Sequence, residues 1–312
     1  MTKEKIILDC DPGHDDALAL AMAVASEQID LLAVTTSAGN QTPDKTLNNA
    51  MRMLTLLNAS NIPVASGNKR PLMRQLKIAD YVHGETGLDG ADLPEPNFAP
   101  QKIPAIELIA KTLQVQKEPI TLVVTGPMTN IALFLRVYPE LKSKIKQIVF
   151  MGGAAGTGNV MPTTEFNMAV DPEAAKIVIN ENIPMVMAGL NVTLKAQLLN
   201  QDVEDIGKIN NPVAQAIYGQ MKFYGIFYGQ DKFGLEGTPV HDPCTIAWLL
   251  HPEYFETHEC YIDVETHGQL TAGETIVDEV GLTGKEKNAQ VLMDIERENF
   301  AALVKKLLHN FD

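Results

Sequence analysis

Residues 9–16 read Asp-Cys-Asp-Pro-Gly-His-Asp-Asp; they follow the apolar run Ile6-Ile7-Leu8 and precede the helix-like run 17–25. Carboxylates packed this closely raise one another's pKa, so a folded chain keeps them mainly where a cation or a reaction uses them. Two of the acids could cap a helix N-terminus, where the helix dipole favours negative charge. Capping does not explain Asp9 and Asp11 at the end of the strand. The stretch therefore predicts a strand, a turn and a helix whose acids converge on one functional point.

Strand-like and helix-like runs alternate along much of the chain. Apolar, β-rich runs occupy residues 5–11, 29–36, 62–65, 120–125, 147–151 and 183–188. Helical spacing of apolar residues occurs between them, at 43–58, 106–115 and 171–180. This order predicts an α/β fold with an open, mostly parallel sheet flanked by helices, a Rossmann-like arrangement.

Polar and glycine-rich loops come directly after several of the predicted strands, at Asp11, 37–40, 125–127 and 151–153. In open α/β sheets ligands bind beyond the carboxyl ends of the strands, so these loops are expected to form one ligand-binding rim. The chain has neither a linker-like run nor an internal repeat, which predicts a single domain over residues 1–312. The Gly- and Pro-containing segment 68–101 has no regular pattern, and we expect it to form a lid-like loop.

The composition limits the kind of partner that the protein can have. The 312 residues are 45% hydrophobic, enough to fill a core, and carry a formal net charge of -14. Nucleic acids and anionic membranes bind basic surfaces more tightly than acidic ones, so neither is expected as a partner. The N-terminus shows no signal-peptide pattern, the chain shows no membrane span, and its cysteines are few and scattered, which predicts a cytoplasmic protein. Cys10 should pack on the strand face opposite its acidic neighbours.

Four parts of the chain together resemble the calcium-dependent nucleoside hydrolases. They are Asp9 to Ala19, the turn Thr-Gly-Pro-Met-Thr-Asn at 125–130, Glu-Phe-Asn at 165–167 with Asp-Pro-Glu-Ala-Ala at 171–175, and Val-His-Asp-Pro at 240–243. The resemblance begins near Lys5 and continues beyond Trp248. The presence of both His83 and His241 is similar to the branch that includes bacterial pyrimidine-preferring ribonucleoside hydrolases.

The resemblance implies hydrolysis of the N-glycosidic bond of a ribonucleoside such as uridine or cytidine, giving ribose and a free base. It also implies bound Ca²⁺, which takes about six to eight oxygen ligands in irregular geometry. By resemblance, the carboxylates of Asp11, Asp16 and Asp242 and the main-chain carbonyl of Thr125 are ligands, with a water and ribose hydroxyls completing the shell. Asp11 would also be the general base that activates the attacking water.

For the sugar, the family pattern assigns ribose hydroxyls to Asp15, Asn40, Asn159, Glu165 and Asn167, with Met151 packed beside the ring. Asp15 and Glu165 suit a transition state of oxocarbenium character, because nearby anions bind growing positive charge more tightly than they bind the ground state. Asn40 and Asn159 could instead be turn residues, since Asn tolerates left-handed backbone geometry.

Glu165 and Asn167 stand at alternate positions of a segment that we expect to be extended. Alternate positions of an extended chain face the same side, so both should reach the ligand while Phe166 turns into the protein. Phe166, which stands between Glu165 and Asn167, is also a substrate-binding candidate.

The departing base needs a proton donor. His241 lies beside Asp242 ahead of the apolar helix 245–250, and we predict that it supplies this proton directly or through a relay; capping of the helix is the alternative. His83 in the lid-like loop is expected to contact the base or the ribose. Tyr224 and Tyr228 are one helical turn apart, which makes them leaving-group candidates, although such an aromatic stripe is also typical of core packing. His14 receives no role.

Two other classes of function stay open. The strand-end acids Asp9 and Asp11 also resemble the start of the magnesium-dependent aspartate phosphatases, although that scheme has no place for the pairs 15–16 and 241–242. A non-catalytic calcium- or ribose-binding protein would keep the same fold without turnover, yet all the acids that catalysis needs are in place. The family resemblance suggests a homodimer or homotetramer with a role in nucleoside salvage. The preference for a purine or a pyrimidine base does not follow from the sequence.

Overall fold

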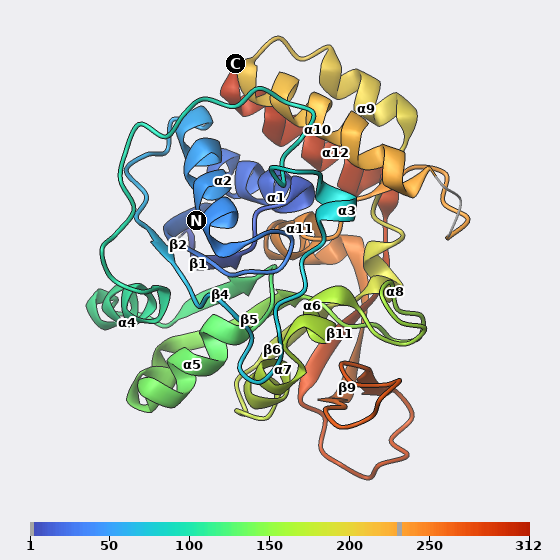
Figure 1. Ribbon diagram of the computed structural model, residues 1–312. Coiled ribbons are helices and arrows are strands. Elements are labelled where there is room, and N and C mark those ends of the chain that lie inside the picture. Colours follow the sequence, from blue (N-terminus) through green and yellow to red (C-terminus); the bar gives the residue numbers. More distant parts are fainter. Residues whose placement is uncertain (1–2, 230–232) are drawn as a thin grey trace.

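The computed structural model describes residues 3–229 and 233–312 (Figure 1). Its strands are β1 (Glu4–Cys10), β2 (Ile29–Thr36), β3 (Val64–Ser66), β4 (Ile120–Val124), β5 (Ile145–Met151), β6 (Met185–Ala188), β7 (Gln197–Leu198), β8 (Thr238–Pro239), β9 (Phe255–Val264), β10 (Thr275–Asp278) and β11 (Ala289–Ile295). Its α-helices are α1 (His14–Ala25), α2 (Pro43–Leu56), α3 (Asp80–His83), α4 (Ala105–Val115), α5 (Thr129–Val137), α6 (Phe166–Val170), α7 (Pro172–Ile179), α8 (Leu190–Thr193), α9 (Asn200–Gly207), α10 (Pro212–Tyr228), α11 (Pro243–Leu250) and α12 (Arg297–Leu308). Short 3-10 helices lie at Pro139–Lys144, Pro252–Tyr254 and His309–Phe311.

The central sheet has nine strands in the order β10-β9-β11-β6-β5-β4-β1-β2-β3. The strands from β11 to β3 pair in parallel, whereas β9 pairs antiparallel with both β11 and β10. The predicted open, mostly parallel sheet in a single domain is confirmed. The two short strands β7 and β8 form a separate antiparallel pair.

Helices cover both faces of the sheet, with α1, α2, α10 and α12 in one layer and α4, α5 and α7 in the other (Figure 1). The central strand β1 shows why the sequence requires two layers. Ile6 and Leu8 pack into the cluster that includes α1, α10 and α12, whereas Ile7 packs into the cluster of α4, α5 and α7. Successive side chains of a strand point to opposite faces, so an unbroken apolar run needs cover on both sides.

The sheet order brings the acidic motif and the middle of the chain together. β1 lies between β2 and β4, and the backbone N–H of Thr125 donates to the carbonyl of Asp9 at 2.9 Å. Asp11 and Thr125, each just beyond the end of its strand, therefore lie at the same central position on the rim. Cys10, one residue earlier, is buried in the core, as predicted for its packing role.

The predicted elements are present with shifted ends. The strand at 29–36 has the predicted bounds, the run at 62–65 forms a strand at Val64–Ser66, and the helix expected from residue 17 already begins at His14. The sequence analysis did not identify the C-terminal strands β9, β10 and β11, two of which give the sheet its antiparallel edge.

The segment 68–101 is irregular apart from the single helical turn α3. It is attached to the body of the protein near its start and near its middle: the Leu72 N–H donates to the Asp171 carboxylate at 2.9 Å, and the side chain of Asn49 donates to the Thr86 carbonyl at 2.9 Å. Its role as a lid stays a prediction.

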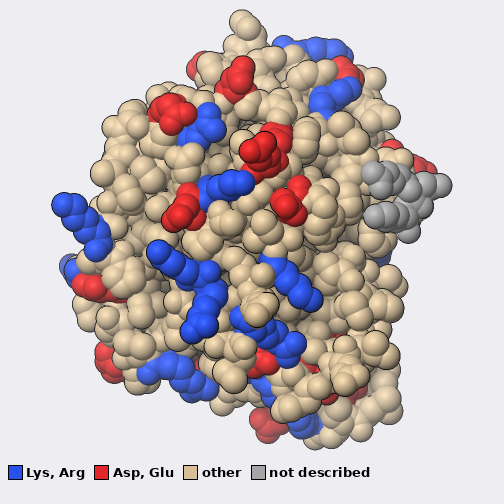
Figure 2. Space-filling view, in the orientation of Figure 1, with Lys and Arg blue, Asp and Glu red and all other residues tan. Residues whose placement is uncertain are grey.

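Two surface properties bear on partners. On the face shown in Figure 2, basic and acidic side chains are interspersed. None of the helices in the described ranges combines the length and apolar character that a membrane-spanning segment needs.

Candidate active site

A pocket opens beyond the ends of β4 and β5, where open α/β sheets bind their ligands. The predicted residues that line it are Asp15, Asn40, His83, Thr125, Met151, Asn159, Glu165, Phe166, Asn167, Tyr224, Tyr228, His241 and Asp242. Asp11 and Asp16 lie behind this wall, each hydrogen-bonded to a residue that lines it. Residues separated by more than two hundred positions in sequence are thus gathered in one place.

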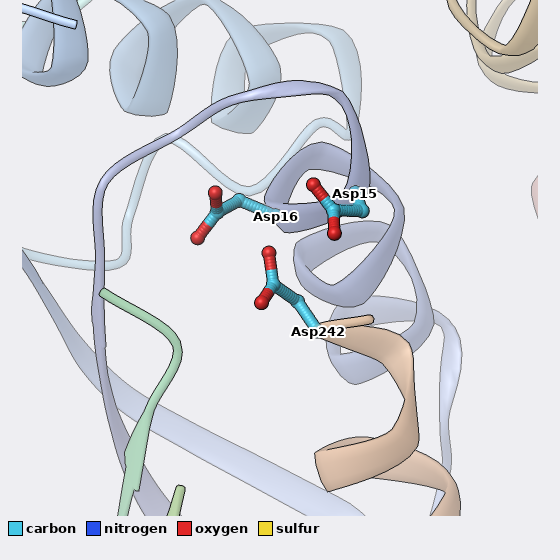
Figure 3. A group of neighbouring side chains, drawn as sticks. All are labelled: Asp15, Asp16 and Asp242. Carbon is cyan, nitrogen blue, oxygen red and sulfur yellow. The ribbon is translucent and has the colours of Figure 1, made fainter. Parts of the chain in front are cut away.

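Three buried carboxylates meet where two helices begin. Asp15 and Asp16 stand in the first turn of α1, and Asp242 is the residue before α11. An oxygen of each lies within 4.8 Å of an oxygen of the other two, and Figure 3 shows the three side chains around one common space. Carboxylate oxygens are the ligands that hard divalent cations prefer.

Asp16 is held in place by neighbours from three loops. Its carboxylate accepts hydrogen bonds from the Gly13 N–H at 3.0 Å, the Asn40 side chain at 3.0 Å and the Thr125 hydroxyl at 2.8 Å. These donors come from the turns after β1, β2 and β4. The carboxylate is therefore oriented before any ligand arrives.

Of the two carboxylate oxygens of Asp11, one accepts a hydrogen bond and the other has no partner among the described residues. Its Oδ2 accepts the Asn40 N–H at 2.6 Å, whereas its buried Oδ1 has no hydrogen-bond partner among the described residues. Two glycines allow the backbone to come close to this carboxylate. If Gly39 carried a side chain, its Cβ would lie 2.2 Å from Oδ2, and a Cβ on Gly126 would lie 2.6 Å from Oδ1. A buried carboxylate oxygen without a partner is costly, which points to a group that the site is built to receive.

Burial dominates the ionisation of this cluster. Burial raises the pKa of Asp16 to about 7, with a further contribution from the neighbouring charge of Asp15. Burial also raises the pKa of Asp11 and of Asp242 well above the ordinary value, and the nearby aspartates act in the same direction. A divalent cation among these oxygens would reverse this effect, because opposite charge favours the ionised form.

The residues present fit a calcium ion. Three gathered carboxylates, together with the partnerless oxygen of Asp11 and the carbonyl of Thr125 in the adjoining loops, offer the hard oxygen donors that such an ion needs. The closest group of three contains Asp15, which the sequence analysis assigned to ribose, while Asp11 lies one layer deeper. The assignment of individual ligands stays a prediction.

Asn167 links this cluster to the sugar side of the pocket. Its side-chain amide donates to the carbonyl of Thr125 at 2.8 Å and to that of Met151 at 3.2 Å. Its amide oxygen is left to face a ligand in the pocket that Asn167 lines. Asn167 therefore ties together two loops that hold predicted site residues.

The predicted extended conformation at 165–167 is wrong, because α6 begins at Phe166. Glu165 is the N-cap, and its carboxylate accepts the N–H groups of Asn167 at 2.8 Å, Gly153 at 2.9 Å and Met168 at 3.2 Å. Burial raises its pKa to about 7 in spite of these donors. Phe166 does not turn into the protein but lines the pocket, since the first helical turn projects it outward.

The two asparagines are not left-handed turn residues. Among the described residues other than glycine, positive φ occurs at Asn58 and Asn182. Asn40 instead donates to both Asp11 and Asp16. The side-chain oxygen of Asn159 accepts the N–H of Phe166 at 2.9 Å, which leaves its amide nitrogen for other partners.

The pocket wall also contains a chain of hydrogen bonds centred on His241. Its Nδ1 lies 2.8 Å from the Thr193 hydroxyl, and its Nε2 lies 2.8 Å from the Tyr228 hydroxyl. Tyr228 in turn accepts a longer hydrogen bond, at 3.4 Å, from Tyr224. Burial lowers the pKa of His241, so its ring is neutral near neutral pH and can exchange one proton along this chain.

His241 also connects this chain to the carboxylate cluster. Its backbone N–H donates to the Asp15 carboxylate at 3.2 Å. Both ring nitrogens are engaged with Thr193 and Tyr228, so the ring does not cap the helix that follows. His241 therefore contacts both the carboxylate cluster, through Asp15, and the chain of hydrogen bonds to Tyr228.

The sequence analysis missed part of the pocket wall. Tyr81 and Val82 from α3, Phe227 from α10 and Phe233 beyond it also line the pocket. Tyr81 contacts Phe227 edge to face, with ring centroids 6.0 Å apart. The stripe of Tyr224 and Tyr228 indicates that this helix contributes aromatic rings, but the contact with α3 depends on how the segment 68–101 crosses the fold.

Comparisons with known proteins agree with this geometry. Residues 6–302 match the family model described as inosine-uridine preferring nucleoside hydrolase. The chain is 56% identical over 307 residues to the pyrimidine-specific ribonucleoside hydrolase RihA of Shewanella baltica (strain OS155), covering 98% of this chain and 96% of that protein. It is 56% identical over 299 residues to the protein of the same name from Escherichia coli O6:H1, covering 96% of each.

Solved structures of similar shape include other nucleoside hydrolases. The purine-preferring ribonucleoside hydrolase from Gardnerella vaginalis superimposes with a TM-score of 0.91 at 29% identity, covering 98% of this chain and 99% of that one. The inosine-uridine preferring nucleoside hydrolase from Bacillus anthracis superimposes with a TM-score of 0.82 at 21% identity, with the same coverage. The second likeness shows the fold alone.

Proposed function

Since the chain belongs to the inosine-uridine preferring nucleoside hydrolase family, we propose that it hydrolyses the N-glycosidic bond of pyrimidine ribonucleosides to ribose and the free base. Membership makes it a nucleoside hydrolase, whereas the phosphatase and the non-catalytic alternatives have no support in the family. The observation that carries the proposal is the pocket itself, in which buried carboxylates face a histidine–tyrosine relay.

The preference for pyrimidines rests on the relatives. Proteins 56% identical to this chain over nearly their whole length bear the name pyrimidine-specific ribonucleoside hydrolase. A likeness to the purine-preferring enzyme at 29% identity is weaker support for the other preference.

We propose Ca²⁺ as the cofactor, held by Asp11, Asp16, Asp242 and the carbonyl of Thr125. When bound, such an ion lowers the pKa of a water in its shell. The free Oδ1 of Asp11 makes this carboxylate the group suited to take the proton from the attacking water.

Asp15 and Glu165 supply negative charge around the sugar, where it stabilises the oxocarbenium-like transition state. Three backbone N–H groups hold Glu165, so its carboxylate has no freedom to turn away. Further contacts to the ribose are proposed for Asn40, His83, Met151, Asn159, Phe166 and Asn167, all of which line the pocket.

The leaving base receives a proton from the relay in the pocket wall. Tyr228 lies between His241 and Tyr224, so the protonated form of the His241 ring can give its Nε2 proton to the Tyr228 hydroxyl, which passes its own proton to the base and leaves the ring neutral. The free, buried cysteines fit a reducing compartment such as the cytoplasm. We further propose a homodimer or homotetramer active in nucleoside salvage.

The test is incubation of the purified protein with uridine, cytidine, inosine and adenosine, with free base and reducing sugar measured together. Equal release of both products, fastest from the two pyrimidine nucleosides, is the expected result. Faster hydrolysis of inosine than of uridine would refute the base preference, and no release from any nucleoside would refute the proposed activity.

A further inference from the structure

His14 stands in the acidic motif but has no part in the proposed mechanism. It is the first residue of α1 and is fully buried, at 0% exposure. Its ring does not line the pocket; it stacks near Phe223 and Tyr224 of α10, with ring centroids 5.4 Å away in each case. A buried imidazole needs hydrogen-bond partners, because an unpaired polar group in the interior is costly.

Both partners of the His14 ring lie in the segment 68–101. Nδ1 lies 3.1 Å from Nδ1 of His83, and Nε2 lies 2.8 Å from the backbone carbonyl of Asp89. A carbonyl can only accept, so Nε2 of His14 carries a proton. One imidazole therefore joins the acidic motif to two separate points of the segment 68–101.

His83 is fixed on its protein side and free on its pocket side. Its Nδ1 lies against the His14 ring, and a Cβ on Gly13 would lie 2.6 Å from its ring. Among the described residues no hydrogen bond reaches the Nε2 of His83, which lines the pocket. Nε2 is consequently the nitrogen left for a ligand.

From this arrangement we propose that His14 is a positioning residue: it holds the His83 ring so that Nε2 points at the nucleoside. The inference rests on the proposed function, since it requires the pocket to bind a nucleoside. It predicts that His14 acts on catalysis only through His83, although it lies next to Asp15.

The rest of the segment has its own attachments, so loss of the His14 contacts leaves it folded. The Gln41 side chain donates to the carbonyls of Gly84 and Glu85 at 3.0 and 3.1 Å, and the Asn49 side chain donates to the Thr86 carbonyl. The carboxylate of Asp89 closes the turn by accepting the N–H groups of Glu85 and Thr86. The effect of changing His14 should therefore be local.

The first experiment is a double-mutant cycle on the full chain. His14→Phe keeps a flat ring but removes both hydrogen bonds, and we expect kcat/KM for uridine to fall about tenfold. In a His83→Ala background the same substitution should change kcat/KM by less than about twofold, because its only route of action is gone. His267→Phe, at an exposed histidine that does not line the pocket, is the matched control and should leave activity unchanged.

A rescue variant separates positioning from simple packing. His14→Gln offers an amide oxygen toward His83 and an amide N–H toward the Asp89 carbonyl, so it should retain kcat/KM within about threefold of the wild type. An unchanged rate in His14→Phe, or an equal loss in the His83→Ala background, would overturn the proposal. Wild-type activity on uridine is measured alongside, so that a failure of the proposed function is recognised separately.

A measurement on the unaltered protein does not depend on how the variants fold. With ¹⁵N-labelled histidine, the hydrogen bond between the two Nδ1 atoms should give a coupling between their resonances. Absence of this coupling, with both resonances assigned, would contradict the contact on which the proposal rests.

Discussion

Replacement of Tyr228 by Phe tests the relay at the leaving-group end of the pocket. The substitution removes only the hydroxyl that lies 2.8 Å from Nε2 of His241. His241 is buried, so the Nε2 that loses its partner lies away from bulk water, although Tyr228 itself is only half-buried where it lines the pocket. Loss of a hydrogen bond that leaves a buried group unpaired costs about 1–3 kcal/mol, and a factor of ten in rate corresponds to about 1.4 kcal/mol.

We therefore expect kcat for uridine to fall by about ten- to a hundredfold in Tyr228→Phe. The assay compares uridine with 4-nitrophenyl β-ribofuranoside, whose leaving group departs as a stable anion and needs no proton. For this second substrate the loss should be less than about threefold. The matched control is Tyr218→Phe on the same helix, whose hydroxyl contacts the exposed Glu204 and not the pocket.

The two substrates distinguish proton transfer from packing. An equal loss on both would mean that Tyr228 shapes the pocket without assisting the leaving group. An unchanged rate on uridine would remove the tyrosine and its hydrogen bond to His241 from the mechanism.

Four further results are expected. Asp11→Asn should lower kcat by about a hundredfold or more while calorimetry still detects Ca²⁺ binding, and an unchanged rate would refute the general base. Burial raises the pKa of Glu165 to about 7, so kcat/KM should rise with pH through about 7 as the carboxylate ionises; this rise should be absent from Glu165→Gln. 2′-Deoxyuridine should react at least about tenfold more slowly than uridine, since it lacks a hydroxyl for the proposed calcium shell, and comparable rates would count against that shell. Asp171→Ala removes the acceptor for the Leu72 N–H and the Thr129 hydroxyl, so urea denaturation should show about 2 kcal/mol less stability, whereas an unchanged midpoint would show the contacts to be unimportant.

The parallel core of the fold could be predicted because its signals are local. The apolar run at 6–8 needs cover on both faces, and the acids that follow it mark the end of the strand. The strands β9, β10 and β11 were not predicted, because exposed and buried positions alternate imperfectly in them. In β9, for instance, Glu256, Glu259 and other polar residues interrupt the apolar pattern.

The site was predicted most completely where the residues belong to contiguous motifs. Asp15, Asp16 and Asp242 gather in space, whereas the family resemblance implied Asp11, Asp16 and Asp242 as the metal carboxylates with Asp15 at the ribose, an assignment that stays a prediction. The conformation at 165–167 was predicted wrongly because a short helix and an extended segment cannot be told apart over three residues. Here the capping carboxylate of Glu165 decides the outcome, since it satisfies N–H groups at the start of α6.

Other residues could not be assigned from the sequence at all. The positions of His14 and Tyr81 depend on the path of the irregular segment 68–101, which no periodic pattern describes. Long irregular segments are placed by tertiary contacts such as those of Gln41 and Asn49, and these contacts become visible only in the folded chain.

The most direct test of the central claim follows uridine hydrolysis by protein treated with a calcium chelator, before and after Ca²⁺ is added back. The proposed mechanism predicts that release of uracil and ribose stops in the chelator and returns with Ca²⁺, because the carboxylates around Asp16 and Asp242 would be the ligands of that ion. Full activity in excess chelator would contradict the metal site and the mechanism built on it.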